Sequence, residues 1–319
     1  MSFGFVFPGQ GSQSVGMLAQ LLSIDTDGVI RSTFNEASEV LGYDLWRLVQ
    51  EGPEDQLNAT ERTQPAMLVA GVATWRLWRG RGGGVPTVVS GHSLGEFTAL
   101  VCAGALELRS AVDLVRFRGQ AMQEAVPLGT GAVAAILGLE QPVLEDACRE
   151  AAHGEVVAPA NFNAPGQIVI AGHTAAVQRA IEGAKARGAK RAVLLPVSVP
   201  VHTSLMRAAA ERFAVRLKNV QISEPHIRFI SAVDGAPHHD SRDLHELLIR
   251  QLPSPVRWLD TVKAVNSTGI SQLIECGPGK VLTGLNRRIE KREGLEFMAL
   301  EDATSIDAAL AATKGDINA

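Results

Sequence analysis

The residues with the clearest chemical potential form the stretch Gly91-His92-Ser93-Leu94-Gly95, which has the G-x-S-x-G pattern of a nucleophile elbow. In such an elbow a tight, strained turn pushes the serine hydroxyl clear of the backbone. The two glycines permit the turn, because side chains there would collide with the neighbouring strand and helix. The apolar run 85–89 predicts a buried strand before the motif, and the apolar segment 94–103 predicts a helix after it. This strand–turn–helix context favours a nucleophilic Ser93 over a serine that only caps a helix.

A serine hydroxyl needs a general base to be nucleophilic at neutral pH. Of the eight histidines, His202 is favoured because it lies just ahead of a predicted helix, at the junction of two parts of the chain. His226 and His245 remain alternatives. No acidic residue between Ser93 and His202 has a motif-like setting, so the Ser, acid, His order of ordinary α/β-hydrolases is not matched. A backbone carbonyl could orient the histidine instead of a carboxylate.

An arginine interrupts the apolar stripe of the second helix after the elbow. Ser110 and Asp113 resemble a capping box that opens this helix, which we expect to run to about Val126. Arg118 falls within the stripe, so its side chain points inward. A buried guanidinium is costly without an anionic partner. The sequence therefore predicts an arginine that snorkels to the surface, an internal carboxylate near Arg118, or an anionic ligand.

The alternation of helices and strands predicts the elements that position these residues. In the outer parts of the chain it indicates an α/β fold with a parallel sheet covered on both faces. The order β-α-β-β-α-β over residues 128–198 is ferredoxin-like and indicates a small domain inserted into a large domain of residues 1–127 and 199–319. A strand over 3–7 leads into Pro8-Gly9-Gln10-Gly11, which is either a plain turn or a close backbone approach. Another helix is expected to begin near Pro65.

Composition excludes several classes of protein. The net charge of −4 argues against a nucleic-acid binder. Three widely spaced cysteines form neither a metal site nor a disulfide framework, and each is expected to be a small buried residue. There is no basic N-terminal signal region and no apolar run of the roughly 20 residues that a membrane helix needs. We expect a cytoplasmic protein that contacts neither nucleic acid nor membrane.

Six motifs stand in one order along nearly the whole chain. They are Phe5-Val6-Phe7-Pro8-Gly9-Gln10-Gly11-Ser12-Gln13, Gly91-His92-Ser93-Leu94-Gly95-Glu96, Arg118-Gly119, Asn161-Phe162-Asn163-Ala164-Pro165-Gly166-Gln167, Val199-Pro200-Val201-His202 and Glu275-Cys276-Gly277-Pro278-Gly279. Together they closely resemble the bacterial malonyl-CoA:acyl carrier protein transacylases of fatty acid synthesis. The resemblance implies an α/β-hydrolase-like core with an inserted ferredoxin-like domain and an active site in the cleft between them.

The resemblance also implies a ping-pong acyl transfer. Ser93, deprotonated by His202, takes the malonyl group from malonyl-CoA and passes it to the phosphopantetheine thiol of acyl carrier protein. Arg118 would hold the malonyl carboxylate, which supplies the missing anionic partner. The backbone N–H groups of Gln10 and Leu94 would form the oxyanion hole.

In this family the main-chain carbonyl of Gln251 would accept a hydrogen bond from His202 in place of a carboxylate. Coenzyme A enters as part of the substrate, and no metal or other cofactor is expected. The protein is expected to be a monomer apart from its carrier. A basic group near the end of the small domain is a candidate docking face for an acidic carrier, or an ordinary solvated helix end. It comprises Lys185, Arg187, Lys190 and Arg191.

Alternative functions share parts of this signature. The chain could load malonyl onto the carrier of a malonate decarboxylase or polyketide system, or act as a serine thioesterase or hydrolase, or bind a carrier without catalysis. Three positions depart from the family pattern. Phe97 stands in place of tyrosine, Val201 in place of serine or phenylalanine, and Ser231-Ala232 in place of paired asparagines. Val201 bears on acyl specificity, and Ser231-Ala232 is not assigned to the site.

Overall fold

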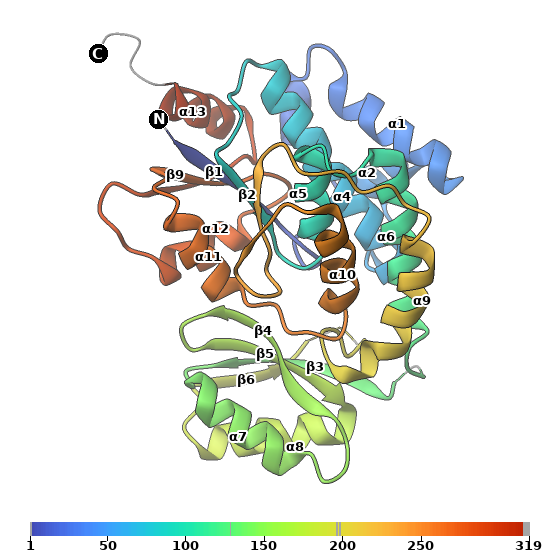
Figure 1. Ribbon diagram of the computed structural model, residues 1–319, viewed down its shortest axis with the longest axis vertical. Helices are drawn as coiled ribbons and strands as arrows, with labels where there is room; N and C mark the ends of the chain where they lie inside the picture. Colours follow the sequence, from blue (N-terminus) through green and yellow to red (C-terminus); the bar gives the residue numbers. More distant parts are fainter. Residues whose placement is uncertain (1, 128, 196, 198, 315–319) are drawn as a thin grey trace.

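The described chain is built around two β-sheets. The computed structural model describes residues 2–127, 129–195, 197 and 199–314. A six-stranded sheet forms the upper part in Figure 1, and a four-stranded sheet forms the lower part. The fold is α/β, as the sequence predicts.

The larger sheet has the strand order β10-β9-β1-β2-β7-β8, in which every neighbouring pair is parallel except β7 with β8. Its strands are β1 (Phe3–Phe7), β2 (Val88–Gly91), β7 (Arg228–Ile230), β8 (Pro237–His238), β9 (Gln272–Glu275) and β10 (Glu296–Ala299). Alternate residues of β1 enter different apolar clusters: Phe5 and Phe7 lie in one, and Val6 lies in the other. Because side chains of a strand alternate between faces, the sheet is covered on both sides.

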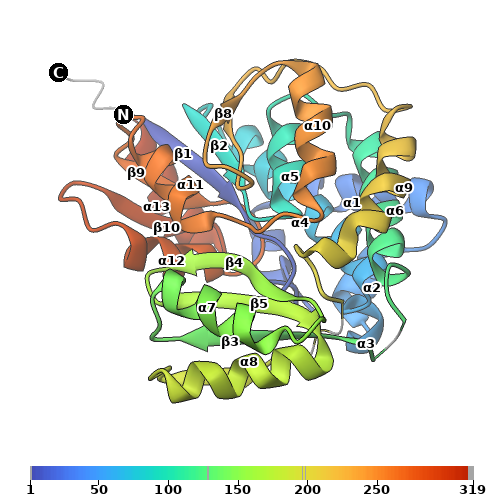
Figure 2. The same ribbon diagram turned by 60° about the horizontal axis from the view of Figure 1, so that its bottom comes forward.

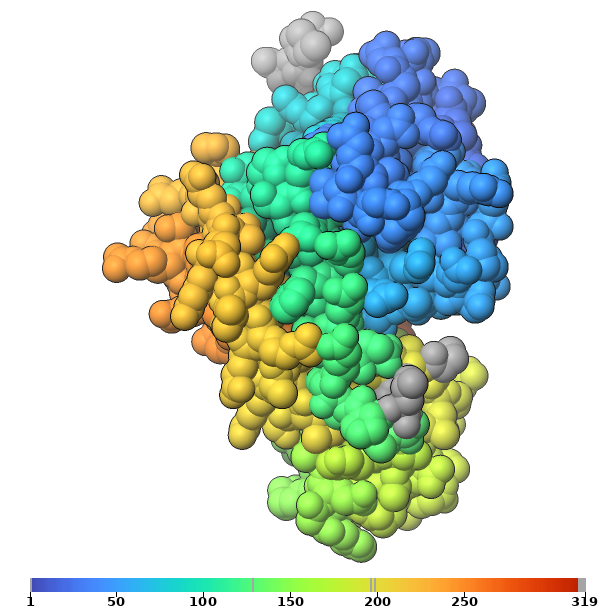
Figure 3. Space-filling model, turned by 90° about the vertical axis from the view of Figure 1, so that its right-hand side faces the viewer, coloured from blue at the N-terminus to red at the C-terminus, as the bar shows by residue number. Residues whose placement is uncertain are grey.

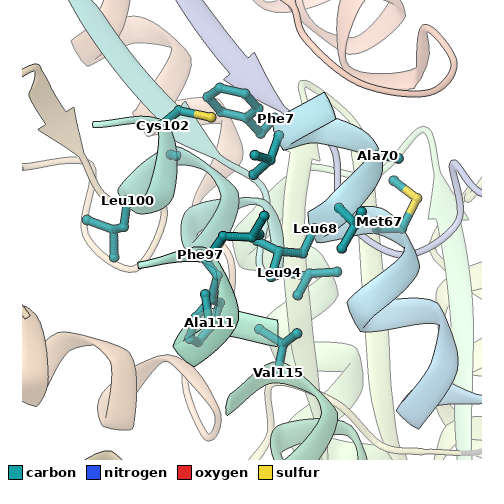
Figure 4. Packing of buried hydrophobic residues seen from close by; sticks show 14 of the residues in the cluster. Phe7, Met67, Leu68, Ala70, Leu94, Phe97, Leu100, Cys102, Ala111 and Val115 are labelled. Atoms are coloured by element: carbon teal, nitrogen blue, oxygen red, sulfur yellow. The ribbon is translucent and has the colours of Figure 1, made fainter. Parts of the chain in front are cut away.

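Helices make both covering layers. The larger cluster, part of which Figure 4 shows around Phe7, Leu94 and Phe97, packs most of the helices against one face. They are α1 (Val29–Leu41), α2 (Leu45–Glu51), α3 (Glu54–Leu57), α4 (Thr60–Gly80), α5 (Gly95–Cys102), α6 (Leu108–Gln123), α9 (Arg207–Leu217), α10 (Ser241–Gln251), α13 (Ala303–Thr313) and the short 3-10 helices η1 (Ala19–Ile24) and η2 (Ser204–Met206). The other face is covered by α11 (Trp258–Asn266) and α12 (Val281–Ile289).

The smaller sheet is antiparallel, with the order β4-β5-β3-β6. Its elements are β3 (Gly131–Leu137), α7 (Gln141–Ala151), β4 (Val157–Ala164), β5 (Gln167–His173), α8 (Thr174–Ala186) and β6 (Arg191–Leu194), and both helices lie on one face of the sheet (Figure 2). This is the predicted β-α-β-β-α-β order. We propose that these elements form the inserted domain; its expected boundary residues 128 and 198 lie outside the described residues.

Two backbone hydrogen bonds join strand β4 of the smaller sheet to the segment after α10. The backbone N–H of Phe162 donates to the Val256 carbonyl at 2.8 Å, and Val256 N–H donates to Ala160 at 2.9 Å. These bonds add the segment after α10 to the edge strand β4. On the surface, α6 and α9 lie side by side above the smaller sheet (Figure 3).

Three local predictions were wrong. The predicted capping box at Ser110 does not open α6, because Glu107 caps that helix by accepting from the Ser110 N–H at 2.7 Å. Helix α4 starts at Thr60 rather than near Pro65; the proline lies inside it, and long-range packing of this fully buried stretch offsets the lost N–H donor. Strand β2 starts at Val88, and Val85 is exposed.

Candidate active site

Ser93 occupies the turn between β2 and α5 in a left-handed conformation, with φ +52°. The flanking glycines are required by packing: a Cβ on Gly91 would lie 1.9 Å from the Gly95 carbonyl carbon, and one on Gly95 would lie 2.0 Å from the Phe7 oxygen. This confirms the reason expected for both glycines. A Cβ on Gly9 would come within 2.5 Å of the His92 oxygen. The open question about residues 8–11 is thereby resolved as a close backbone approach to the elbow.

His202 is the histidine that meets Ser93. Its Nε2 lies 2.7 Å from the Ser93 Oγ, and its Nδ1 lies 3.1 Å from the Gln251 carbonyl oxygen and 3.0 Å from that of Ser254. Two carbonyls can only accept, so Nδ1 carries the proton and Nε2 is left to accept from the serine hydroxyl. The backbone of His202 is strained, with φ +59°, as is often seen at functional sites.

The electrostatic setting keeps His202 neutral. Burial lowers its pKa to about 3, the charge of Arg118 acts in the same direction, and the two carbonyls oppose the shift. A neutral imidazole is the form that can take a proton from Ser93. The alternative histidines have other surroundings: His226 is exposed, and both ring nitrogens of His245 face backbone carbonyls, those of Ser241 and Val220.

Arg118 is fully buried on α6, and its guanidinium lies beside the nucleophile. One terminal nitrogen donates to the Gln64 Oε1 at 2.8 Å; the other donates to the Gln251 Oε1 at 2.8 Å and lies 3.3 Å from the Ser93 Oγ. Within the described chain its Nε has no partner. Burial lowers the pKa of Arg118 to about 10, so the group stays charged at neutral pH. No carboxylate pairs with it directly among the described residues.

Glu96, which directly follows the elbow's second glycine, is a buried acid whose charge acts on Arg118. Its Oε1 accepts from the Ser231 hydroxyl at 2.7 Å and the Ala232 N–H at 2.6 Å, and its Oε2 accepts from the side-chain amide of Gln251. Ser231-Ala232 therefore binds Glu96, even though these residues depart from the family pattern.

The two backbone donors expected for an oxyanion hole flank the serine turn. Leu94 precedes the first turn of α5, and Gln10 follows the Gly9 backbone that packs on His92. In the part of the chain that the structure describes, neither N–H donates to a protein acceptor.

Other features bear on function less directly. The three cysteines are buried and unpaired, as expected. Over the described ranges no cluster of three His, Cys, Asp or Glu side chains could hold a metal ion. No described helix combines the length and apolar character needed to cross a bilayer.

Part of the predicted basic docking group is already paired. Lys185 forms an ion pair with Glu182, and Arg187 forms one with Glu150. Lys190 and Arg191 are exposed.

Sequence reasoning missed Gln64, Glu96, the Ser254 carbonyl and the side-chain amide of Gln251. A signal existed for two of them. Glu96 is a charged residue in an apolar helix, and Gln64 is a polar residue on a buried face, which is the same pattern that singled out Arg118. Nothing in the sequence distinguished the carbonyl of Ser254.

Known proteins share this arrangement of elements. The family model for the acyl transferase domain matches residues 4–300. The chain is 51% identical to the malonyl CoA-acyl carrier protein transacylase of Salmonella typhimurium over 308 residues, which cover 97% of this chain and 98% of the relative. An acyl carrier protein S-malonyltransferase from Vibrio cholerae superposes with a TM-score of 0.93 at 54% identity, over 97% of this chain and 99% of that one. A malonyl-transacylase solved in complex with its type II PKS acyl-carrier protein superposes with a TM-score of 0.95 at 49% identity, over 98% of this chain and 100% of that one. The chain belongs to the malonyl CoA-acyl carrier protein transacylases, within the acyl transferase domain family.

Proposed function

We propose that this protein transfers a malonyl group from malonyl-CoA to the phosphopantetheine thiol of an acyl carrier protein, through an ester on Ser93. The reaction is ping-pong, because the same serine serves the donor and the acceptor in turn. The product, malonyl-acyl carrier protein, is supplied to fatty acid synthesis.

The observation that carries this proposal is the buried, charged guanidinium of Arg118 beside the nucleophile. A cation fixed 3.3 Å from the Ser93 Oγ favours an acyl group that ends in a carboxylate. Its unpaired Nε supplies a further buried donor, and an unpaired buried donor is costly unless a ligand uses it. A plain acyl chain such as acetyl would leave this donor unpaired.

In the first half-reaction, His202 Nε2 takes the hydroxyl proton as the Ser93 Oγ attacks the thioester carbon. The carbonyl oxygen becomes an oxyanion, which the N–H groups of Gln10 and Leu94 stabilise. The carbon–sulfur bond then breaks, and the sulfur of coenzyme A leaves with the proton from His202. The malonyl ester stays on Ser93, with its free carboxylate on Arg118.

In the second half-reaction the roles reverse. The phosphopantetheine thiol gives its proton to His202 and attacks the ester carbon, and Ser93 leaves and regains the proton. The Gln251 and Ser254 carbonyls hold the Nδ1–H of His202 in both halves, so the imidazole keeps one orientation without an acidic third residue. The protein's own residues supply all of these steps, and no metal or cofactor takes part in the proposal.

Relatives support the choice of acceptor. One structural neighbour is described as a malonyl-transacylase in complex with its type II PKS acyl-carrier protein. Transfer to a fatty acid carrier and transfer to a polyketide carrier use the same chemistry, so the carrier protein alone distinguishes the two pathways. A cytoplasmic location remains part of this proposal.

The test is intact-protein mass spectrometry after mixing with malonyl-CoA. We expect one malonyl group on the wild-type chain, none on Ser93→Ala, and a strongly reduced rate for His202→Ala. Peptide mapping should place the ester on Ser93. Loading of Ser93→Ala at the wild-type rate would overturn the proposal.

A further inference from the structure

Gln251 contacts Ser93, His202 and Arg118 at once. Its carbonyl faces His202 Nδ1 at 3.1 Å, its side-chain oxygen accepts from Arg118 at 2.8 Å, and its amide nitrogen donates to the Ser93 carbonyl at 2.9 Å. The same amide nitrogen donates to the Glu96 Oε2. The orientation of this one amide therefore determines whether Arg118 and the Ser93 carbonyl each face its oxygen or its NH₂ group.

Glu96 is the group that decides this orientation. It is fully buried on α5, and all three hydrogen-bond partners of its carboxylate are donors: the Ser231 hydroxyl, the Ala232 N–H and the Gln251 amide. A carboxylate surrounded by donors is held as an acceptor. The NH₂ group of Gln251 must therefore face Glu96, which turns its oxygen toward Arg118.

This arrangement also explains why a buried cation can persist without a direct counter-ion. The Gln251 amide separates the carboxylate of Glu96 from the guanidinium of Arg118, with its oxygen on the cation and its NH₂ on the anion. The negative charge thus stabilises Arg118 from one residue away and leaves part of the guanidinium unpaired. A direct ion pair would instead occupy the donors that an acyl carboxylate needs.

We propose that Glu96 is a positioning residue for acyl selectivity: it locks the Gln251 amide so that Arg118 is held beside Ser93, charged and open to a carboxylate. The inference rests on the proposed malonyl transfer and adds a determinant of its specificity. Among the described contacts the Glu96 carboxylate bonds neither Ser93 nor His202, and only its backbone N–H reaches the serine turn, where it donates to the Ser93 carbonyl at 3.0 Å.

The substitution Glu96→Gln tests this directly. Glutamine is isosteric with glutamate, but its NH₂ group at position 96 must face either the NH₂ of Gln251 or the donors of Ser231 and Ala232. No orientation satisfies all the partners, so the Gln251 amide loses its fixed direction. We expect the ratio of malonyl to acetyl loading rates on Ser93 to fall about 10- to 100-fold, the range for a buried hydrogen bond to a charged group.

Two controls separate positioning from general damage. Ser231→Ala removes one donor to Glu96 but keeps its charge and its contact with Gln251, so the ratio should stay within about twofold. In an Arg118→Met background, Glu96→Gln should change the ratio no further, because its effect acts through Arg118. Thermal melts show whether each variant folds.

If Glu96→Gln does not fold, Glu96→Asp takes its place. Aspartate keeps the charge but is one methylene shorter, and the malonyl-to-acetyl ratio should again fall, by less than for glutamine. Equal losses for malonyl and acetyl in the variant that folds would overturn the inference. A wild-type chain that loads no malonyl on Ser93 would reject the proposed function, and this inference with it.

Discussion

Replacing Arg118 by methionine should convert a malonyl-selective enzyme into one that no longer prefers a charged acyl group. Methionine keeps much of the side-chain volume in this fully buried position but removes the charge and the donors to Gln64 and Gln251. The malonyl carboxylate would then be buried without a partner, which costs about 3–5 kcal/mol. At about 1.4 kcal/mol per factor of ten, malonyl loading should slow roughly 100- to 5,000-fold.

Acetyl loading provides the internal reference. Acetyl has no carboxylate, so the loss of Arg118 should change its loading rate by less than about threefold once any general disturbance at Ser93 is included. The assay is rapid quenching followed by intact-protein mass spectrometry, with malonyl-CoA and acetyl-CoA in parallel. Arg116→Met is a matched control, because Arg116 lies on the same helix but pairs with Asp113. Equal losses for the two acyl groups would refute the role of Arg118.

Four further predictions follow from the geometry and the electrostatics. Because the pKa of His202 is lowered to about 3, single-turnover loading should fall less than about twofold between pH 7 and pH 5, where a base of pKa 6.5 would lose more than tenfold; a midpoint near 6.5 would contradict this. The unfolded chain protonates this histidine below about pH 6.5 while the folded chain does not, so the free energy of unfolding should fall as the pH drops toward 3, by up to about 1.4 kcal/mol per pH unit. The fall should be less steep in the His202→Gln variant, and the same pH dependence of the urea-derived free energy of unfolding in both proteins would argue against this. Gly95→Ala should destabilise the fold by about 1–3 kcal/mol or more because its Cβ would meet the Phe7 oxygen, whereas Gly284→Ala, in open space on α12, should be neutral or stabilising in thermal melts. Lys190→Glu with Arg191→Glu should raise the KM for carrier protein severalfold at low salt, with Lys185→Glu, already paired to Glu182, as the weaker control; an unchanged KM would remove this face from consideration.

The parts of the fold that could be predicted from sequence are those that local patterns specify. The glycine spacing around Ser93 predicts the elbow because neighbouring backbone lies so close to Gly91 and Gly95 that a Cβ at either position would collide with it. Periodicity predicts the β-α-β-β-α-β order of the smaller sheet. The helix starts were less predictable: α6 is capped by Glu107 rather than Ser110, since cap choice depends on a hydrogen bond that many polar residues near a helix start could make.

In the candidate site, too, local sequence patterns predict some features, whereas contacts between distant parts of the chain could not be predicted. Arg118 could be found because a charge in an apolar helical stripe conflicts with burial, and Glu96 carries the same signal on α5. What could not be predicted is that the Gln251 amide joins the two. Gln251 lies 133 positions from Arg118 and 155 positions from Glu96 in the chain. The second carbonyl on His202, from Ser254, likewise depends on how the segment after α10 pairs with β4.

The central claim is that Ser93 holds a malonyl group for transfer rather than for hydrolysis. The most direct test is to isolate the malonylated chain, free of malonyl-CoA, and follow the ester by mass spectrometry with and without phosphopantetheinylated acyl carrier protein. We expect the carrier thiol to discharge the ester and to yield malonyl-carrier protein, while water alone removes the ester far more slowly. Release of free malonate at the same rate with and without the carrier would contradict a transfer role and identify the protein as a hydrolase.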